Sequence, residues 1–426
     1  MNRIILIGNG FDLAHKMLTN YKNFIDDYWY NVVEEVKNIP INKPFENDDI
    51  LVQHSPSNFI KKNTYQDLKE NLIRNKKSPI QFKNRFLEII TNKTYLNNCD
   101  WVDVENEYYI LLKESIEKKR LSNNYYKIKD LNSDFNKIKN HLEKYLVGVD
   151  DHFNKNIESD FLQTKNIIGH KIYHPFKLKD FSENSINQKA EYEYSLLKKY
   201  IDAPSEDKIT INELDDRGQS ILQKIDLKNP LNGIRKLLQS DYAVNYFDLI
   251  PDQTLFLNFN YTFTDKIYKN PREFDQFNEL KYTKVKYLHI HGTIAPEDKN
   301  PIIFGFGDEL DDNYKLIEKL NDNDYLKNIK SINYLDTNNY KQLLEFINSA
   351  NYQIYIFGHS CGISDRTLLN TVFEHDNCAS VKLFYHQKDE QNDNYSDIIR
   401  NISRNFNDKA KMRDRVVNKN YSEPLR

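Results

Sequence analysis

The strand-like segments of this chain are gathered at its two ends, and this placement limits the folds open to it. The first is the apolar run from Arg3 to Ile7. Five further runs follow after residue 250, at 254–258, 285–290, 301–304, 352–357 and 381–385. Short apolar strands bounded by turn residues are typical of a parallel sheet covered on both faces. The pattern therefore predicts one sheet whose first strand is distant in sequence from all the others.

The long stretch between these ends has the periodicity of helices. Apolar residues recur every three or four positions in 21–37, 103–118, 132–149 and 191–201. Segments 38–65 and 150–185 lack such a period and predict loops. Two more helices, at 339–349 and 365–375, alternate with the late strands, as βαβ units require. We therefore expect an α/β fold in which residues 1–24 and 246–410 form a Rossmann-like parallel-sheet core and residues 25–245 form a mostly helical insertion.

The composition narrows the classes of partner. Among 426 residues, 60 are Lys or Arg and 63 are Asp or Glu, for a net charge of -3. This balance argues against a nucleic-acid partner. The three cysteines, Cys99, Cys361 and Cys378, lack the spacing of a zinc site and fit a reducing compartment. Because the chain also lacks a membrane-length apolar run and a secretory leader, we expect a cytoplasmic protein with no membrane partner and no metal.

A glycine motif, Gly8-Asn9-Gly10-Phe11-Asp12, directly follows the first strand. A glycine at the carboxyl end of a strand permits a tight turn and lets backbone N–H groups approach a phosphate. The third glycine of the dinucleotide-binding fingerprint is replaced by Leu13, so a plain strand-to-helix turn is the structural alternative. We predict that these five residues, Gly8, Asn9, Gly10, Phe11 and Asp12, bind a nucleotide.

Two asparagines, Asn258 and Asn260, end the strand at 254–258 and share one side of it by strand alternation. Buried amides need hydrogen-bond partners, and the carboxyl edge of a parallel sheet is where α/β proteins bind ligands. An asparagine-rich turn is the alternative. The sequence predicts that both amides face the nucleotide.

The next strand ends in His289-Ile290-His291-Gly292. A metal-binding pair is an alternative, but no carboxylate or cysteine ligand lies at a familiar spacing. We predict that His291, beside the Gly292 turn, is an acid–base group, whereas His289 belongs to the core.

A fourth strand is followed by Gly358-His359-Ser360, with Asp365 a few residues later. Gly358 can admit a ligand close to the backbone, and Ser360 can donate to a ribose or base. We predict that Gly358, Ser360 and Asp365, together with Gly292 of the preceding motif, bind the nucleotide. The spacing is also similar to a hydrolase nucleophile elbow, in which Ser360 would need His375 or His386 as its base. Because the carboxyl ends of parallel strands meet at one edge, all these turns are expected to converge there.

An acidic helix start, Asp103, Glu105 and Glu107, is the remaining candidate site. Acidic residues in a first turn are favoured by the helix dipole, and this is their structural explanation. Paired carboxylates for acid–base chemistry are the functional alternative.

Taken in order, five segments resemble the AbiH family, which is associated with bacterial abortive infection against phage. They are IILIGNGFDLAHKMLTNYKNF, WVDVENEYY, LNFNYTFT, HIHGTI and IFGHSCGISD, and they span nearly the whole chain. The resemblance implies an anti-phage role.

The chain is also distantly similar to sirtuin-like NAD-binding domains, including defence proteins that hydrolyse NAD. This similarity implies that Gly8 and Gly10 form the phosphate loop, that Asn260 orients the ribose and water, and that His291 is the acid–base group. Gly358 and Ser360 match the turn near the adenosine ribose. Two departures are Thr262 in place of the usual acidic residue, and the absence of the zinc-binding cysteines, which argues against protein deacylation.

Three functional hypotheses follow. The first is hydrolysis of the N-glycosidic bond of NAD or a related nucleotide, with Asn260 and His291 as catalytic residues and no metal. The second is a module that binds a nucleotide and a defence-system partner or another copy of the chain, without turnover. The third is a nuclease that uses Asp103, Glu105 and Glu107 with a divalent ion.

Overall fold

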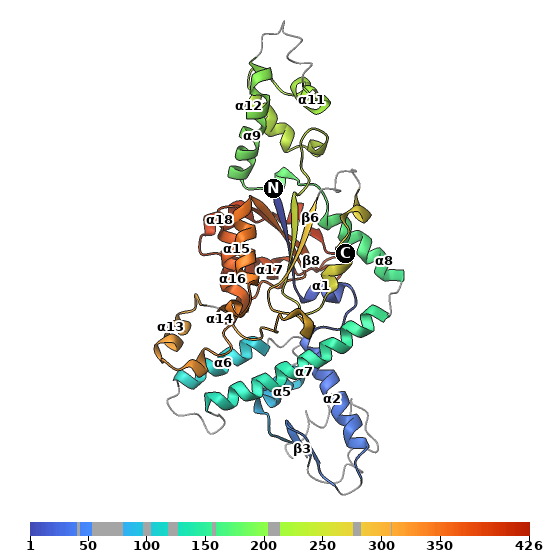
Figure 1. The fold of residues 1–426 in the computed structure, drawn as a ribbon, viewed down its shortest axis with the longest axis vertical. Coiled ribbons are helices and arrows are strands. Elements are labelled where there is room, and N and C mark those ends of the chain that lie inside the picture. Colours follow the sequence, from blue (N-terminus) through green and yellow to red (C-terminus); the bar gives the residue numbers. More distant parts are fainter. Residues whose placement is uncertain are drawn as a thin grey trace.

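A six-stranded parallel sheet forms the centre of the molecule (Figure 1). The computed structural model describes residues 1–40, 43–52, 80–96, 104–117, 127–155, 159–202, 214–275, 283–307 and 309–426. In spatial order the strands are β6 (Lys284–His289), β5 (Gln253–Asn258), β1 (Asn2–Ile7), β7 (Tyr352–Phe357), β8 (Cys378–Tyr385) and β9 (Glu423–Pro424). Because β1 pairs with β5 on one side and β7 on the other, the first strand lies inside the sheet.

Helices cover both faces of this sheet, as the continuous apolar strands require. Ile4 and Leu6 of β1 face a core formed with α15 (Asn339–Ser349), α16 (Arg366–Glu374) and α17 (Tyr395–Asn405). Ile5 and Ile7 point to the opposite face, where α1 (Asn9–Ala14) and α8 (Ser159–Ile172) pack. The predicted α/β architecture with a parallel sheet is confirmed.

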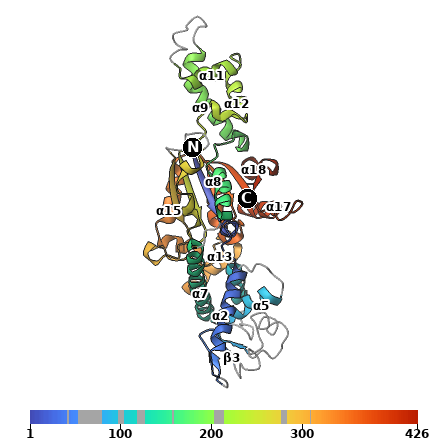
Figure 2. The ribbon, with the colours of Figure 1, turned by 90° about the vertical axis from the view of Figure 1, so that its right-hand side faces the viewer.

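Two helical groups extend from opposite ends of the sheet (Figures 1 and 2). Beyond the carboxyl ends of the strands lie α2 (Tyr21–Lys37), α5 (Arg85–Leu96), α6 (Val104–Glu117) and α7 (Ile128–Lys155). A small antiparallel sheet, β2 (Phe45–Glu46), β3 (Ile50–Val52) and β4 (Ile80–Phe82), belongs to this group. Near the amino-terminal edge are α9 (Glu183–Ile201), α11 (Asp216–Lys224) and α12 (Pro230–Leu238), which share a separate core. The remaining helices are α13 (Asp312–Lys319), α14 (Lys330–Asn333) and α18 (Lys409–Arg415).

Some sequence predictions need correction. Residues 301–304 are not a strand, because their backbone bonds to loops; the Ile303 N–H, for example, donates to the His291 carbonyl at 2.8 Å. The predicted loop at 150–185 contains α8, whose sparse apolar residues Ile168 and Ile172 are fully buried against the sheet. The predicted loop at 38–65 contains β2 and β3, and its remainder after residue 52 lies outside the described residues.

The central strands thus come from 2–7 and from 253 onward, with helices and the small sheet between them. The division into a core at 1–24 and 246–410 and an insertion at 25–245 stays a prediction. Within the described ranges, no helix combines the length and apolar character needed to cross a membrane.

Two glycines should respond in opposite directions to the same substitution. Gly358 has φ +68°, and a Cβ there would lie 2.1 Å from the Phe11 nitrogen, so Gly358→Ala should lower the free energy of unfolding by roughly 2–4 kcal/mol through strain and overpacking. Gly148 lies within α7, and a Cβ there would meet nothing within 4 Å. Gly148→Ala should raise the free energy of unfolding by about 0.5–1 kcal/mol through helix propensity. Urea denaturation measures both, and equal stabilities would contradict the packing described.

Candidate active site

A cavity of about 440 Å³ lies at the carboxyl edge of the sheet, around the end of β1. In the sheet, β5 and β6 lie on one side of β1, whereas β7, β8 and β9 lie on the other. The cavity therefore lies at the topological switch point, where open α/β sheets bind ligands. Turns after β1, β5, β6 and β7 line the cavity, together with Leu142 and Leu146 of α7.

Nine of the twelve predicted site residues line this cavity. They are Gly8, Asn9, Gly10, Asp12, Asn260, His291, Gly358, Ser360 and Asp365. Asn260 and His291 therefore share one pocket, although they follow different strands.

The other three predicted site residues have structural positions instead. Phe11 is fully buried against the sheet. Asn258 is also fully buried, and its side chain shapes the turn by accepting from the Asn260 N–H at 2.8 Å and donating to the Thr262 carbonyl at 3.3 Å. Gly292 has φ +87°, and a Cβ there would lie 2.1 Å from the Pro301 oxygen. Core packing thus accounts for Phe11, and turn geometry accounts for Asn258 and Gly292.

A buried lysine organises the charged side of the cavity. Lys330, the first residue of α14, places its Nζ 2.7 Å from Glu105 Oε2 and 2.9 Å from Asp365 Oδ1. His291 Nε2 lies 3.2 Å from the same Asp365 oxygen, and His359 Nε2 lies 3.7 Å from the other. Two carboxylates and two imidazoles thus surround one cation.

The surroundings fix the charge of each group. Burial opposes ionisation of Asp365, but Lys330 and the histidines hold the pKa of that carboxyl well below its ordinary value. Burial also opposes the charge of Lys330, yet Asp365 and Glu105 raise its pKa. Burial lowers the pKa of His291, and it lowers the pKa of His359 to about 4. At neutral pH the cluster therefore contains an anionic aspartate beside two neutral imidazoles.

Asp12 is a third buried carboxyl group in the lining of the cavity, after Glu105 and Asp365. The Thr262 hydroxyl donates to its Oδ2 at 2.6 Å, and the Thr264 hydroxyl donates to its Oδ1. Burial raises the pKa of Asp12 to about 6, and the threonine bonds limit that rise. Thr262 and Thr264, which follow β5, thus bind a carboxylate that comes from α1.

The glycine loop packs against the turn after β7. The N–H groups of Gly8, Gly10 and Phe11 donate to the carbonyls of Phe357, Gly358 and Gly8 at 3.2, 2.8 and 2.9 Å. A Cβ on Gly8 would lie 2.6 Å from His359 Cα, and one on Gly10 would lie 2.8 Å from the Gly358 oxygen. The two glycines are therefore explained by close contact between turns, and the three amides are already engaged.

Several cavity residues were not among the predicted binding and catalytic residues. Lys330 lies in a segment without a recognisable motif, and only its burial identifies it. His359 is part of the Gly358-His359-Ser360 motif, but spacing alone could not show that its ring faces Asp365. Tyr261, between the predicted asparagine and Thr262, also lines the cavity.

The acidic helix start does not converge on one point in the described part of the chain. Glu105 pairs with Lys330 inside the cavity, whereas Glu107 pairs with Lys93 outside it. Asp103 lies outside the described residues. Within the described ranges, no three His, Cys, Asp or Glu side chains are grouped as metal ligands would be.

The nucleophile-elbow arrangement is also not assembled. Ser360 is exposed at the cavity, where Asn401 binds its carbonyl at 2.8 Å. Neither His375 nor His386 lines the cavity.

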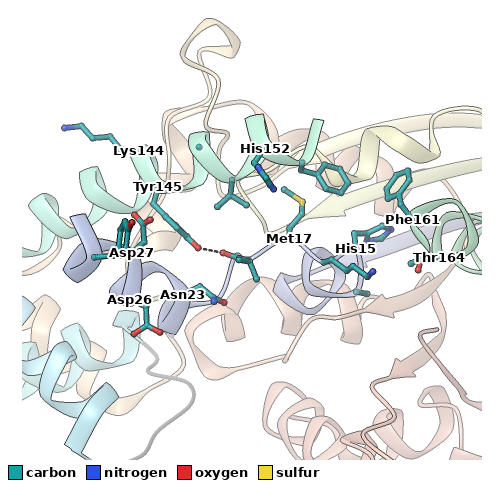
Figure 3. Close-up of a pocket in the computed structure, with 17 residues that line it drawn as sticks. His15, Met17, Asn23, Asp26, Asp27, Lys144, Tyr145, His152, Phe161 and Thr164 are labelled. Atoms are coloured by element: carbon teal, nitrogen blue, oxygen red, sulfur yellow. Dashed lines mark hydrogen bonds between the residues drawn. The ribbon is translucent and has the colours of Figure 1, made fainter. Parts of the chain in front are cut away.

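A larger cavity, of about 810 Å³, is lined by residues 14–18 and by residues of α2, α7 and α8 (Figure 3). Asp26 and Asp27 lie at one end, and His15 and Phe161 lie at the other. Both ring nitrogens of His15 are engaged, at 2.7 Å each, by the Phe11 carbonyl and the Tyr268 hydroxyl. None of the predicted site residues lines this larger cavity, so the smaller one is the candidate active site.

A family model described as bacteriophage abortive infection AbiH matches residues 4–387. The chain belongs to the AbiH family. Family membership indicates a role in abortive infection against phage. In this AbiH protein the match includes every described residue of the candidate site except Asn394. Comparison with curated proteins and with solved structures gives no match.

Replacing Lys330 tests the charged cluster of the AbiH protein. Lys330→Met should lower the free energy of unfolding by about 3–5 kcal/mol, because two buried carboxylates lose their cation. In the wild type, the lowered pKa of Asp365 stabilises the fold at every pH above the pKa of this carboxyl in the unfolded chain. This stability is lost only as pH falls from that value through the lower pKa of the folded protein. In the variant, burial without the cation should raise the carboxyl pKa values, so stability is lost as pH rises through them.

The stability gap between wild type and Lys330→Met should therefore widen from about pH 4 to about pH 7. Urea denaturation across this range measures it. Lys93→Met is the matched control, because that lysine is 40% exposed and its pairing with Glu107 should contribute less than about 1 kcal/mol. A gap that is constant with pH would contradict the assigned charges.

Proposed function

We propose that this AbiH protein hydrolyses the N-glycosidic bond of NAD or a related nucleotide. The observation that carries the proposal is the anionic Asp365 carboxylate, held between Lys330 and His291 on the wall of a cavity at the switch point of the sheet. Cleavage of an N-glycosidic bond develops positive charge on the ribose ring, in an oxocarbenium-like transition state. A buried carboxylate stabilises such a charge strongly, because water does not screen it.

Asn260 is suited to position the ribose. Its Nδ2 donates to the Gly8 carbonyl at 3.0 Å, which fixes the amide plane across the ends of β5 and β1. Its carbonyl oxygen can then accept from a ribose hydroxyl or from the attacking water. This is the role that the similarity to sirtuin-like domains implies.

His291 is suited to accept a proton. Its lowered pKa keeps the ring neutral at physiological pH, as a general base must be. The imidazolium formed on proton uptake would lie 3.2 Å from the Asp365 carboxylate and be stabilised by it. The Tyr334 hydroxyl, 3.1 Å from the same nitrogen, orients the ring.

Binding without turnover is the second candidate function. His291 is only 4% exposed, and its Nε2 already faces Tyr334 and Asp365. A closed network of this kind can serve nucleotide sensing, with a partner or a second copy of the chain as the effector. The nuclease hypothesis has less support, because Glu105 and Glu107 are held by different lysines.

Release of nicotinamide from NAD tests the proposal. Purified wild-type protein should release it, whereas Asn260→Ala and His291→Ala should each lower kcat by roughly two orders of magnitude or more while remaining folded. His375→Ala, outside the cavity, is the control and should retain wild-type activity. Thermal melting distinguishes lost chemistry from lost structure. NAD binding without nicotinamide release would favour the sensing module, and full activity in both variants would overturn the assigned roles.

A further inference from the structure

The side chains that line the candidate active site carry an excess of negative charge. Lys330 is the single cation among the described lining residues, and Glu105 and Asp365 both bind it. One positive charge with two negative charges gives a net charge of -1. Asp12, with its pKa raised by burial to about 6, adds a further negative charge above that pH. A cavity with this charge favours a ligand group that is positive.

Aromatic side chains line the same cavity. Phe259 and Tyr261 flank Asn260 in the turn after β5. The Phe259 ring lies 5.0 Å from the His291 ring and 4.3 Å from the His359 ring, between centroids, which fixes its position beside the anionic cluster. Aromatic faces attract flat cations, and the nearby carboxylates add to this attraction.

The same cavity is unfavourable for the phosphate groups of a nucleotide. Lys330 is already neutralised by two carboxylates, and the N–H groups of Gly8, Gly10 and Phe11 already bind carbonyls. A phosphate beside Asp365 or Asp12 would face like charge in a poorly solvated site. The phosphates of a nucleotide are therefore better placed outside this cavity.

We infer that the cavity recognises a ribose bearing a positively charged heteroaromatic base, and that the phosphates of the substrate lie outside it. This inference rests on the proposed N-glycosidic hydrolysis for its chemistry, but the recognition it describes can be measured without turnover. A nicotinamide riboside unit is one such ligand. A purine that carries a methyl group on N7 is another.

The leaving group explains why a charged base matters for the reaction. When the bond between ribose C1′ and the ring nitrogen breaks, its electron pair passes to that nitrogen and neutralises a cationic base. Water then bonds to C1′ and passes a proton to His291, so the base itself needs no proton. A neutral base would have to leave as an anion unless a general acid protonated it. Above about pH 6 the Asp12 carboxyl is ionised and holds no proton to give. The neutral His291 and His359, and a Lys330 held by two carboxylates, are also poorly suited to supply that proton.

Release of the free base from matched substrates tests the reaction. Nicotinamide riboside should be cleaved with kcat/KM within about tenfold of the value for NAD, because the phosphates add little. The cationic 7-methylguanosine should be cleaved at least about 100-fold faster than guanosine, the usual contribution of a missing general acid. If NAD is cleaved but nicotinamide riboside reacts more than about 100-fold more slowly, the phosphates are recognised. The inference is then wrong, although N-glycosidic hydrolysis stands.

Binding of nicotinamide riboside and of its reduced, uncharged form tests recognition alone. By calorimetry, the His291→Ala variant, in which turnover should be slow, should bind the charged form at least about tenfold more tightly than the reduced form. In this background Glu105→Gln should narrow the preference, and Glu107→Gln, on the same helix but outside the cavity, should leave it unchanged. Equal binding of the two forms by His291→Ala would overturn the inference. Selective binding of the charged form without cleavage of any substrate would support the inference and refute hydrolysis.

Discussion

The buried ammonium of Lys330 is the interaction on which the site depends. It joins α14 to Glu105 of α6 and to Asp365, so three segments far apart in the sequence meet at one atom. Neither carboxylate could remain ionised at this depth without it, because transfer of a charge from water to the interior is costly unless the charge is paired. Burial lowers the pKa of His291 and His359, and the same cation lowers it further. One side chain thus influences the protonation state of every other charged or titratable group in the cluster.

The central position of β1 gives this cluster its location. Because β1 separates β5 from β7, the turns after three adjacent strands enclose a single space, and Asn260 bonds across it to the Gly8 carbonyl. The glycines of the first turn allow the β7 turn to approach within contact distance. The helices α6 and α7 then cover the carboxyl edge and complete the cavity with Glu105, Leu142 and Leu146.

The sequence predicted most of the strands and turns that form the cavity, but it did not predict the charged cluster around Lys330. Period-based reasoning placed α2 and α15 at their observed bounds and found five of the six central strands, because buried strands and amphipathic helices leave local patterns. The two-residue strand β9 and the helix α8 were not predicted, because their sequence patterns are weak. The convergence of Asn260, His291 and Gly358 followed from parallel topology alone. Lys330 could not be found this way, since its partners are distant in sequence and a lone lysine usually indicates a solvated surface.

The pairing of β1 has a consequence for how the protein is made. Its partners include residues 350 positions later in the chain, as the contact between Arg3 and Gln353 shows. On the ribosome, β1 and its glycine turn emerge long before β7, and the pocket cannot close until Gly358, His359 and Asp365 have been synthesised. Distant pairings of this kind slow folding and leave early strands exposed. A nascent chain that has not yet reached these residues would therefore contain the glycine turn but not the candidate site.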